Sequence, residues 1–96
     1  MKHLLLVESD VQRAFADFLR RSRDQQKLSR ERLAERSTVP AATIKKFELS
    51  GQISFRQLLL LWQTLDDLQR LYALTQVTSS RTTMPISIAE VLRDDD

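Results

Sequence analysis

The residues with the clearest chemical potential in this chain are cations, and one stretch holds most of them. Residues 20 to 46 contain nine basic side chains and three acidic ones, a net charge of +6, whereas the rest of the chain carries −4. The nine are Arg20, Arg21, Arg23, Lys27, Arg30, Arg32, Arg36, Lys45 and Lys46. Such a basic band is typical of a surface that binds a phosphate backbone. The alternative is a solvated charged face without a polyanionic partner.

Catalytic and metal-binding chemistry have little support in the sequence. The 96 residues include no cysteine and a single histidine, His3, and they contain no glycine-rich phosphate loop. We therefore expect no enzyme activity, no cofactor and no metal site, with His3 at the surface. The apolar run from Leu4 to Val7 is far shorter than the ~20 residues of a membrane span. Without a membrane helix or signal peptide, we expect a cytoplasmic protein of one domain.

The elements that must position the cations are two short helices predicted between residues 28 and 49. Ser29 stands directly before the first helix, where its hydroxyl can accept a hydrogen bond from an otherwise unpaired backbone N–H. Leu33 and Ala34 supply the buried face of this helix, and the small Ala34 allows a second helix to cross closely. Pro40 suits the first position of that second helix, because its missing N–H costs nothing there.

The second helix is expected to bury Ile44 and Phe47 and to expose its polar side. The residues left on the outer side are Thr43, Lys45 and Lys46, with Ala41 and Ala42 on the leading turn. Two helices joined by the turn at residues 37 to 39 form a helix-turn-helix, in which the second helix enters the DNA major groove. The sequence therefore predicts a DNA-binding surface on this helix.

The motifs of this stretch resemble those of the lambda-repressor-like, Cro/cI-type (XRE) helix-turn-helix family. The matching pairs are Leu28-Ser29, Leu33-Ala34, Thr43-Ile44 and Phe47-Glu48, and the resemblance covers roughly residues 11 to 75. The run Ala42-Thr43-Ile44 and the apolar helix after Ser54 look like HipB, the DNA-binding antitoxin of HipA-type kinase toxins. The resemblance implies an all-α, five-helix fold and a homodimeric repressor that binds a double-stranded DNA operator.

The resemblance also assigns roles to individual residues. The expected DNA contacts are Ser29, Arg30, Ala41, Ala42, Thr43, Lys45, Lys46 and Gln52. Among them Lys46 matches a base-contacting position, whereas Arg30 matches a position that contacts the DNA backbone. Arg23 and Glu48 match an ion pair that fixes the recognition helix against the first helix.

Two positions depart from the family pattern. The family usually has glycine in the turn, for a left-handed backbone, where this chain has Thr38. It often has glutamine or arginine on the leading turn, where this chain has Ala41 and Ala42. Because alanine cannot hydrogen-bond a base, direct readout must depend on contacts with thymine methyl groups and on the lysines.

The remaining segments divide the chain into an arm, the DNA-binding domain and a tail. Residues 1 to 8 form an N-terminal arm, which could be a strand, a swapped arm or an apolar plug. Residues 9 to 75 form the domain, whose first helix is expected to be capped by Ser9 or Asp10. The apolar side of that first helix comprises Val11, Ala14, Phe15, Phe18 and Leu19. Residues 76 to 96 are a polar linker and a C-terminal tail.

The helix after Ser54 is apolar nearly all round, and a fifth helix starts at Asp66 or Asp67. A monomer of this size cannot cover all of that apolar surface, so we expect a two-fold dimer. The predicted interface residues are Leu60, Leu61, Leu68 and Tyr72.

The tail carries a compact apolar cluster after its polar linker. Its members are Ile86, Ile88, Val91 and Leu92. Exposed apolar surface of this kind needs a covering, which is either the protein's own dimer or a separate protein such as a HipA-like kinase toxin. The main functional hypothesis is therefore an autoregulating, HipB-like antitoxin and repressor. The alternatives are a protein-interaction module that holds a partner with little DNA binding, and a phage-type repressor without a toxin.

Overall fold

The computed structural model of this chain describes residues 5–76 and contains five α-helices within them. They are α1 (Glu8–Gln25), α2 (Arg30–Ser37), α3 (Ala41–Ser50), α4 (Phe55–Leu65) and α5 (Leu68–Leu74). No strand occurs among residues 5–76, so the predicted all-α class and the five helices are confirmed for this part of the chain. The tail residues Ile86, Ile88, Val91 and Leu92, like His3, lie outside the described residues.

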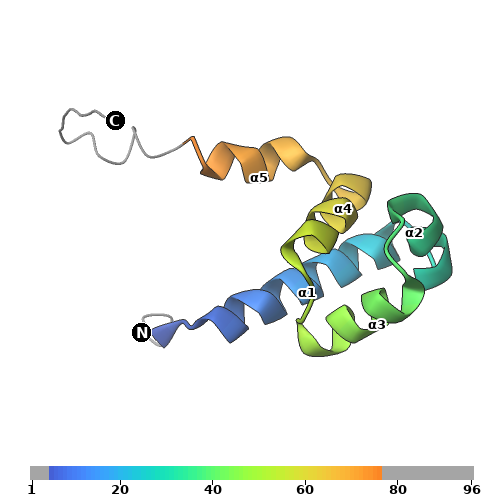
Figure 1. Cartoon of the computed structure of the whole chain (residues 1–96), viewed down its shortest axis with the longest axis horizontal. Helices are drawn as coiled ribbons and strands as arrows, with labels where there is room; N and C mark the ends of the chain where they lie inside the picture. The colour runs from blue at the N-terminus through green and yellow to red at the C-terminus, as the bar shows by residue number, and fades with distance from the viewer. Residues whose placement is uncertain (1–4, 77–96) are drawn as a thin grey trace.

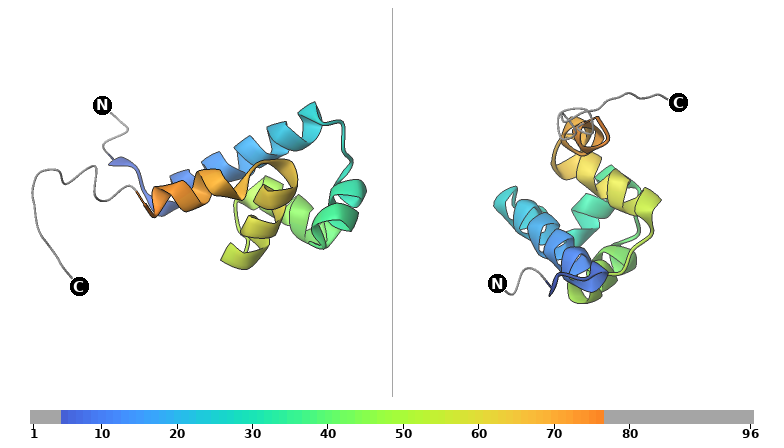
Figure 2. Two further views of the ribbon diagram at one scale, coloured as in Figure 1. Left: turned by 90° about the horizontal axis from the view of Figure 1, so that it is seen from above. Right: turned by 90° about the vertical axis from the view of Figure 1, so that its left-hand side faces the viewer.

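The helices are arranged around α1, which runs along the body of the molecule (Figure 1). Helices α3 and α4 both pack against α1, and α2 packs against α3 and α4. Helix α5 contacts α4 and lies at the opposite end of the body from α3 (Figure 2). The end of the fold that carries α3, with Lys45 and Lys46, is therefore separated from the end that carries α5.

One apolar core joins the first four helices. Its members are Ala16, Leu19, Leu28, Leu33, Val39, Ile44, Phe47, Leu61, Trp62 and Leu65. The predicted inward residues Ile44 and Phe47 are each 1% exposed, which confirms their placement. Trp62 stacks on Phe18 with ring centroids 5.3 Å apart, and its indole N–H donates to the carbonyl of Asp67 at 2.9 Å. Trp62 is thus a core residue whose single polar group is satisfied.

The start and the buried face of α1 differ from the sequence prediction. The helix begins at Glu8, and the Asp10 carboxylate accepts a hydrogen bond from the Val7 N–H at 3.1 Å. Val11 and Ala14 are exposed, whereas Ala16, which the prediction missed, is fully buried. Ala16 and Leu19 belong to the buried core, and α1 packs against α3 and α4. Residues 5 to 7 are exposed and are not strand, so this described part of the arm is no plug on the core.

Two left-handed residues end the first two helices where a glycine would be expected. Lys27 has φ 57° after α1, and the Leu28 N–H then donates to the Arg23 carbonyl at 3.1 Å. Thr38 has φ 68° after α2, so the turn keeps the backbone conformation that favours glycine although the residue is threonine. Pro40 is the residue before α3, one position earlier than predicted.

Candidate nucleic-acid interface

The start of α2 and the inner side of α3 are built by local sequence signals. The Ser29 hydroxyl accepts a hydrogen bond from the Arg32 N–H at 3.0 Å, as predicted for a helix cap. Leu33 from α2 and Ile44 and Phe47 from α3 are each 1% exposed in the shared core. Burial of these three side chains fixes which side of α3 faces outward.

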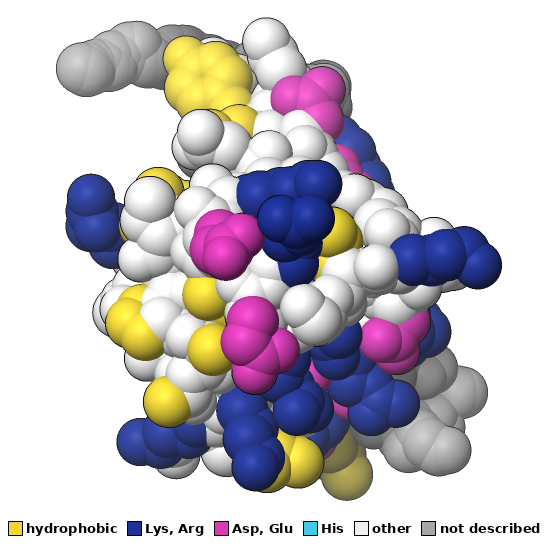
Figure 3. Space-filling model, turned by 90° about the vertical axis from the view of Figure 1, so that its right-hand side faces the viewer, with side chains coloured by type: hydrophobic (Ala, Val, Ile, Leu, Met, Phe, Trp, Pro, Cys, Tyr) yellow, Lys and Arg dark blue, Asp and Glu magenta, His cyan; other side chains and the backbone are white. Residues whose placement is uncertain are grey.

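The outer side of α3 carries two lysines between two apolar side chains. Ala42, Lys45, Lys46 and Leu49 are exposed, and their spacing of three, four and seven residues aligns them along one face of the helix. Ala41 and Thr43 are only half-buried, so Thr43 lies at the border of this face and not at its centre. Figure 3, which views the side of the molecule where α2 lies, shows Lys and Arg side chains gathered there with Asp and Glu between them.

The structure brings Arg23 and Glu48 together, as the family resemblance implied. The Nε of Arg23 donates to Oε2 of Glu48 at 2.7 Å, and a terminal nitrogen of Arg23 donates to Oε1 at 3.1 Å. Arg23 is 9% exposed and Glu48 is 6% exposed. The other terminal nitrogen of Arg23 donates to the Leu28 carbonyl at 2.8 Å. The pair is therefore a buried, two-pronged link between α1 and α3, and not the exposed pair that would contribute little.

Arg30 joins the same carboxylate from the first turn of α2. Its Nε donates to Oε1 of Glu48 at 2.9 Å, while its side chain remains 34% exposed. The sequence expectation for Arg30 was contact with the DNA backbone. In the structure its guanidinium is held by Glu48 and is still partly open to solvent, so Glu48 orients the cation at the start of α2. Three helices thus meet at one carboxylate.

This arrangement determines the ionisation of its members. Burial raises the pKa of the Glu48 carboxyl, but hydrogen bonds from Arg23 and Arg30 and their positive charges outweigh burial, so this pKa lies below its ordinary value. The hydrogen bond to Glu48 raises the pKa of Arg23. Both changes favour the charged forms, and the ion pair therefore persists through the neutral pH range.

Arg13 is a positioning residue that the sequence analysis missed. From α1 it donates to the carbonyls of Glu48 at 3.4 Å and Leu49 at 2.9 Å, which are among the unpaired acceptors at the end of α3. Gly51 follows with φ 82°, and a Cβ there would lie 3.2 Å from the backbone of Gln12. Glycine therefore permits both the turn and the close approach of α3 to α1.

The remaining predicted contact residue, Gln52, lies in the loop after α3. Its side chain is exposed, and its backbone N–H donates to the Ser50 hydroxyl at 3.1 Å. Because this N–H is already paired within the loop, the exposed amide side chain is the part of Gln52 that a phosphate could reach. The exposed members of the predicted set therefore come from the start of α2, from α3 and from the following loop.

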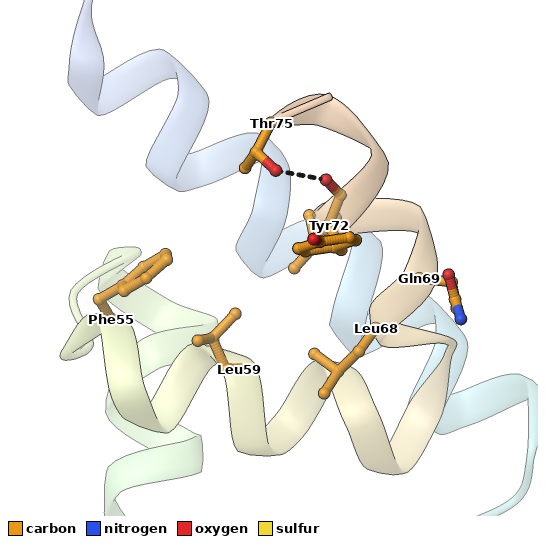
Figure 4. A pocket seen from close by; sticks show the side chains of 7 residues that line it. Phe55, Leu59, Leu68, Gln69, Tyr72 and Thr75 are labelled. Carbon is orange, nitrogen blue, oxygen red and sulfur yellow. Dashed lines mark hydrogen bonds between the residues drawn. The ribbon is translucent and has the colours of Figure 1, made fainter. Parts of the chain in front are cut away.

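An apolar groove of about 500 Å³, the α4–α5 groove, lies away from α3. It is lined by Phe55, Leu59, Leu68, Gln69, Leu71, Tyr72 and Thr75. Figure 4 shows side chains of α4 and of α5 on its two sides. Phe55 is 73% exposed and Tyr72 is 63% exposed, although both are large aromatic residues.

The predicted dimer interface was right about the exposure of Leu68 and Tyr72 and wrong about Leu61. Leu68 and Tyr72 are exposed along the α4–α5 groove, but Leu61 is 1% exposed in the core and cannot meet a partner. Leu60 is half-buried against the same core. Phe55 and Leu59 occupy the groove in their place. The core and the groove share the one apolar side of α4, so the sequence pattern does not separate the residues that each of them covers.

Within residues 5–76, no group of three or more His, Cys, Asp or Glu side chains could hold a metal ion. No helix in the same residues combines the length and the apolar character that crossing a bilayer requires. Comparison with protein families, with curated proteins and with solved structures finds no match to this chain.

Proposed function

We propose that this chain is a DNA-binding transcriptional repressor with a five-helix, lambda-repressor-like fold. In this proposal α2 and α3 form the helix-turn-helix, and α3 enters the major groove. The observation that carries the proposal is the orientation of α3. Its C-terminal end is held by Arg13, Arg23 and Arg30, while Lys45 and Lys46 face outward. A helix fixed in this way presents a rigid row of cations to a polyanion.

The residues on this surface have separate roles in the proposed complex. Lys46, one turn after Ala42 on the outer face, contacts a base edge. Lys45 and Thr43 lie toward the phosphates, and Arg30 contacts the backbone with the part of its guanidinium that remains open. The hydrogen bond from Arg30 to Glu48 orients this contact. Because the Arg30 side chain is already ordered, DNA binding costs less side-chain entropy.

The repressor acts as a homodimer that is joined through the α4–α5 groove. A two-fold interface is made of the same patch from both copies, so the patch must be complementary to itself. The groove meets this condition because no charged residue lines it and because Phe55 and Tyr72 project beside a hollow. Each copy can insert its aromatic residues into the other. Two copies of α3 then contact half-sites one DNA turn apart, ~10–10.5 bp, or a multiple of it.

The cellular role that fits the sequence resemblance is that of a HipB-like antitoxin. In this role the cytoplasmic repressor controls its own operon and binds a HipA-like kinase toxin. Support for the toxin comes from the resemblance alone, and co-purification with the product of an adjacent kinase-like gene tests it. If no such gene is adjacent, the alternative role is that of a phage-type repressor without a toxin. The α4–α5 groove also favours a second candidate, a protein-interaction module with little DNA binding.

Binding of the full chain to duplex DNA at several salt concentrations tests the proposed function. We expect the logarithm of the binding constant to fall linearly with the logarithm of salt concentration, by about 0.9 for each phosphate contact. Lys46→Ala should weaken binding to a selected operator by about 1–3 kcal/mol. Arg70→Ala is the matched control, because Arg70 lies outside the basic band, on α5 beside Phe18 and Trp62 and away from α3.

The outcomes separate the candidates. Weaker binding only for Lys46→Ala supports the repressor and assigns Lys46 to the interface. Equal loss on operator and scrambled DNA makes Lys46 a phosphate contact. A helical, folded protein without any salt-sensitive DNA binding contradicts the repressor and supports the interaction module.

A further inference from the structure

We infer that α3 recognises its half-site through thymine methyl groups and guanine acceptor atoms, and not through the amino groups of adenine or cytosine. The inference rests on the proposed function, because it concerns what the same helix contacts inside the major groove. It follows from the inventory of hydrogen-bonding groups that α3, which lies wholly within the described residues, leaves on its surface.

Along the exposed row of α3, from Ala42 to Leu49, the side chains are donors or apolar groups. Lys45 and Lys46 are exposed and carry only donors. The one carboxylate of the helix, Glu48, is buried and accepts from two arginines, so it is withdrawn from any base. The Ser50 hydroxyl donates to the Lys46 carbonyl and accepts from the Gln52 N–H. The Thr43 hydroxyl, at the border of the face, is the acceptor that remains.

The apolar part of the same surface is equally informative. Ala42 and Leu49 are exposed at the two ends of the row that contains the lysines, and Leu49 is 64% exposed. Ala42 stands on the first turn of α3, where a recognition helix touches base edges. A methyl side chain at that position offers van der Waals contact and no hydrogen bond. It therefore matches the C5-methyl group of thymine.

The four bases differ in how well they suit this surface. Guanine presents the N7 and O6 acceptors, and thymine presents the O4 acceptor beside its methyl group. Both suit the Lys46 donor, which lies between Ala42 and Leu49 on the exposed row. The amino groups of adenine and cytosine would face donors or apolar side chains, because Glu48 is buried and paired with two arginines and Thr43 lies at the border of the face. The buried ion pair thus restricts the chemistry of base recognition as well as the position of the helix.

Base analogues in a selected operator test the inference atom by atom. Deoxyuridine in place of a contacted thymidine removes only the methyl group and should weaken binding about fourfold, the factor expected for one buried methyl-sized group. 7-Deazaguanine removes the N7 acceptor and should also weaken binding. Purine in place of adenine removes the amino group and should weaken binding no more at contacted positions than in the flanks. Each analogue is compared with the same replacement at a flanking pair outside the footprint.

A protein variant supplies the reciprocal test. Ala42→Gln adds an amide that can bond adenine N6 and N7 together, so selection with this variant should replace thymine by adenine at one position of each half-site. Ala14→Gln is the matched control, because Ala14 is exposed on α1 beside Arg21 and Arg70. The control should select the wild-type operator, and circular dichroism verifies that both variants are folded.

Failure of the inference is distinguishable from failure of the proposed function. If salt-sensitive duplex binding is absent, the repressor proposal fails. If the protein binds a selected operator with full salt dependence, but uracil and 7-deazaguanine change nothing or purine weakens binding at contacted positions only, the inference alone is overturned. Selection of the wild-type sequence by Ala42→Gln would also overturn the role of Ala42.

Discussion

The C-terminal end of α3 and the α4–α5 groove differ in whether their side chains have partners within the chain. At the end of α3, a buried carboxylate receives three hydrogen bonds from two arginines, and a third arginine binds the adjacent carbonyls. In the groove, large apolar side chains remain exposed, including Phe55 and Tyr72. The polar groups at the end of α3 find their partners within one chain. The apolar side chains of the groove are buried only if another molecule packs on them.

The difference indicates what each region contributes. Charged groups with fixed geometry determine the orientation of α3 but add little net stability, because burying the charges of Arg23 and Glu48 costs desolvation energy. Contacts between apolar side chains impose no fixed geometry of this kind. An exposed apolar patch is unfavourable in water and is typical of a surface that binds another molecule. The polar region therefore determines what α3 presents, and the apolar region provides for a second copy.

The largest expected effect comes from breaking the polar region. Glu48→Ala leaves Arg23 buried without its partner, which should lower the free energy of unfolding by about 3–5 kcal/mol. Urea unfolding followed by circular dichroism measures the change. Glu35→Ala is the matched control, because Glu35 is exposed and its 3.4 Å contact with Arg32 should contribute less than about 0.5 kcal/mol. An equal decrease in the free energy of unfolding for both variants would contradict the stabilising role of Glu48.

Acid should weaken the same region before it affects the groove. The pKa of Glu48 is lower in the folded state than its ordinary value of 4.5, because hydrogen bonds from Arg23 and Arg30 outweigh burial. Its contribution to stability is therefore complete above pH ~4.5 and is lost as the pH falls through the folded pKa. Unfolding free energies between pH 7 and pH 3 should show this loss. Glu48→Gln should have a flatter acid dependence, and an unchanged slope in this variant would contradict the assignment.

Local signals in the sequence predicted the five helices and the serine caps of α2 and α4. Ser29 and Ser54 cap the helices that follow them, and each bonds an N–H only three residues away. The pair Arg23 and Glu48 came from family resemblance, since nothing local connects positions 25 residues apart. Arg13 was missed for the same reason, because its acceptors lie 35 and 36 residues away in sequence.

The covered side of α4 was the part that the sequence could not predict. Six of the seven large apolar residues of α4 share one side of the helix, opposite Arg56, Gln57, Gln63 and Thr64, so periodicity finds the apolar side but not which part of it the core covers. Leu61 was therefore assigned to an interface although it is buried, and Phe55 was not, although it is exposed. Leu61, Trp62 and Leu65 are the residues of α4 that the core covers, and Trp62 also stacks on Phe18 and donates to the Asp67 carbonyl.

A charge in the groove should separate the copies without unfolding them. Tyr72→Glu should raise the dimer dissociation constant at least tenfold, about 1.4 kcal/mol, because two carboxylates would enter an apolar contact. Helicity should be unchanged, since Tyr72 is 63% exposed in one chain. Sedimentation or light scattering measures the mass. The control is Ala73→Glu, an exposed position on α5 outside the groove lining. A wild-type protein that remains monomeric at high micromolar concentration would contradict the dimer.

The smallest effect concerns Thr38, in the turn that sets the entry of α3. A β-branched residue at φ 68° is disfavoured by about 1–2 kcal/mol, because its Cβ approaches the carbonyl oxygen. Thr38→Gly removes this cost but adds freedom to the unfolded chain, so we expect a net gain of about 0.5–1 kcal/mol. For a domain of this size that gain raises Tm by about 4 °C, which calorimetry can measure.

Thr38→Ala separates the two contributions at this turn. Alanine keeps the Cβ but removes the hydroxyl that donates to the Ser37 carbonyl, so it should not stabilise the protein. If glycine also fails to stabilise, then the threonine hydroxyl offsets the backbone cost. The turn before α3 would then be stabilised by its own side-chain hydrogen bond to the end of α2. A gain with glycine and none with alanine would leave the arginines as the polar groups that hold the helix, and the turn as a strained connection that their contacts keep in place.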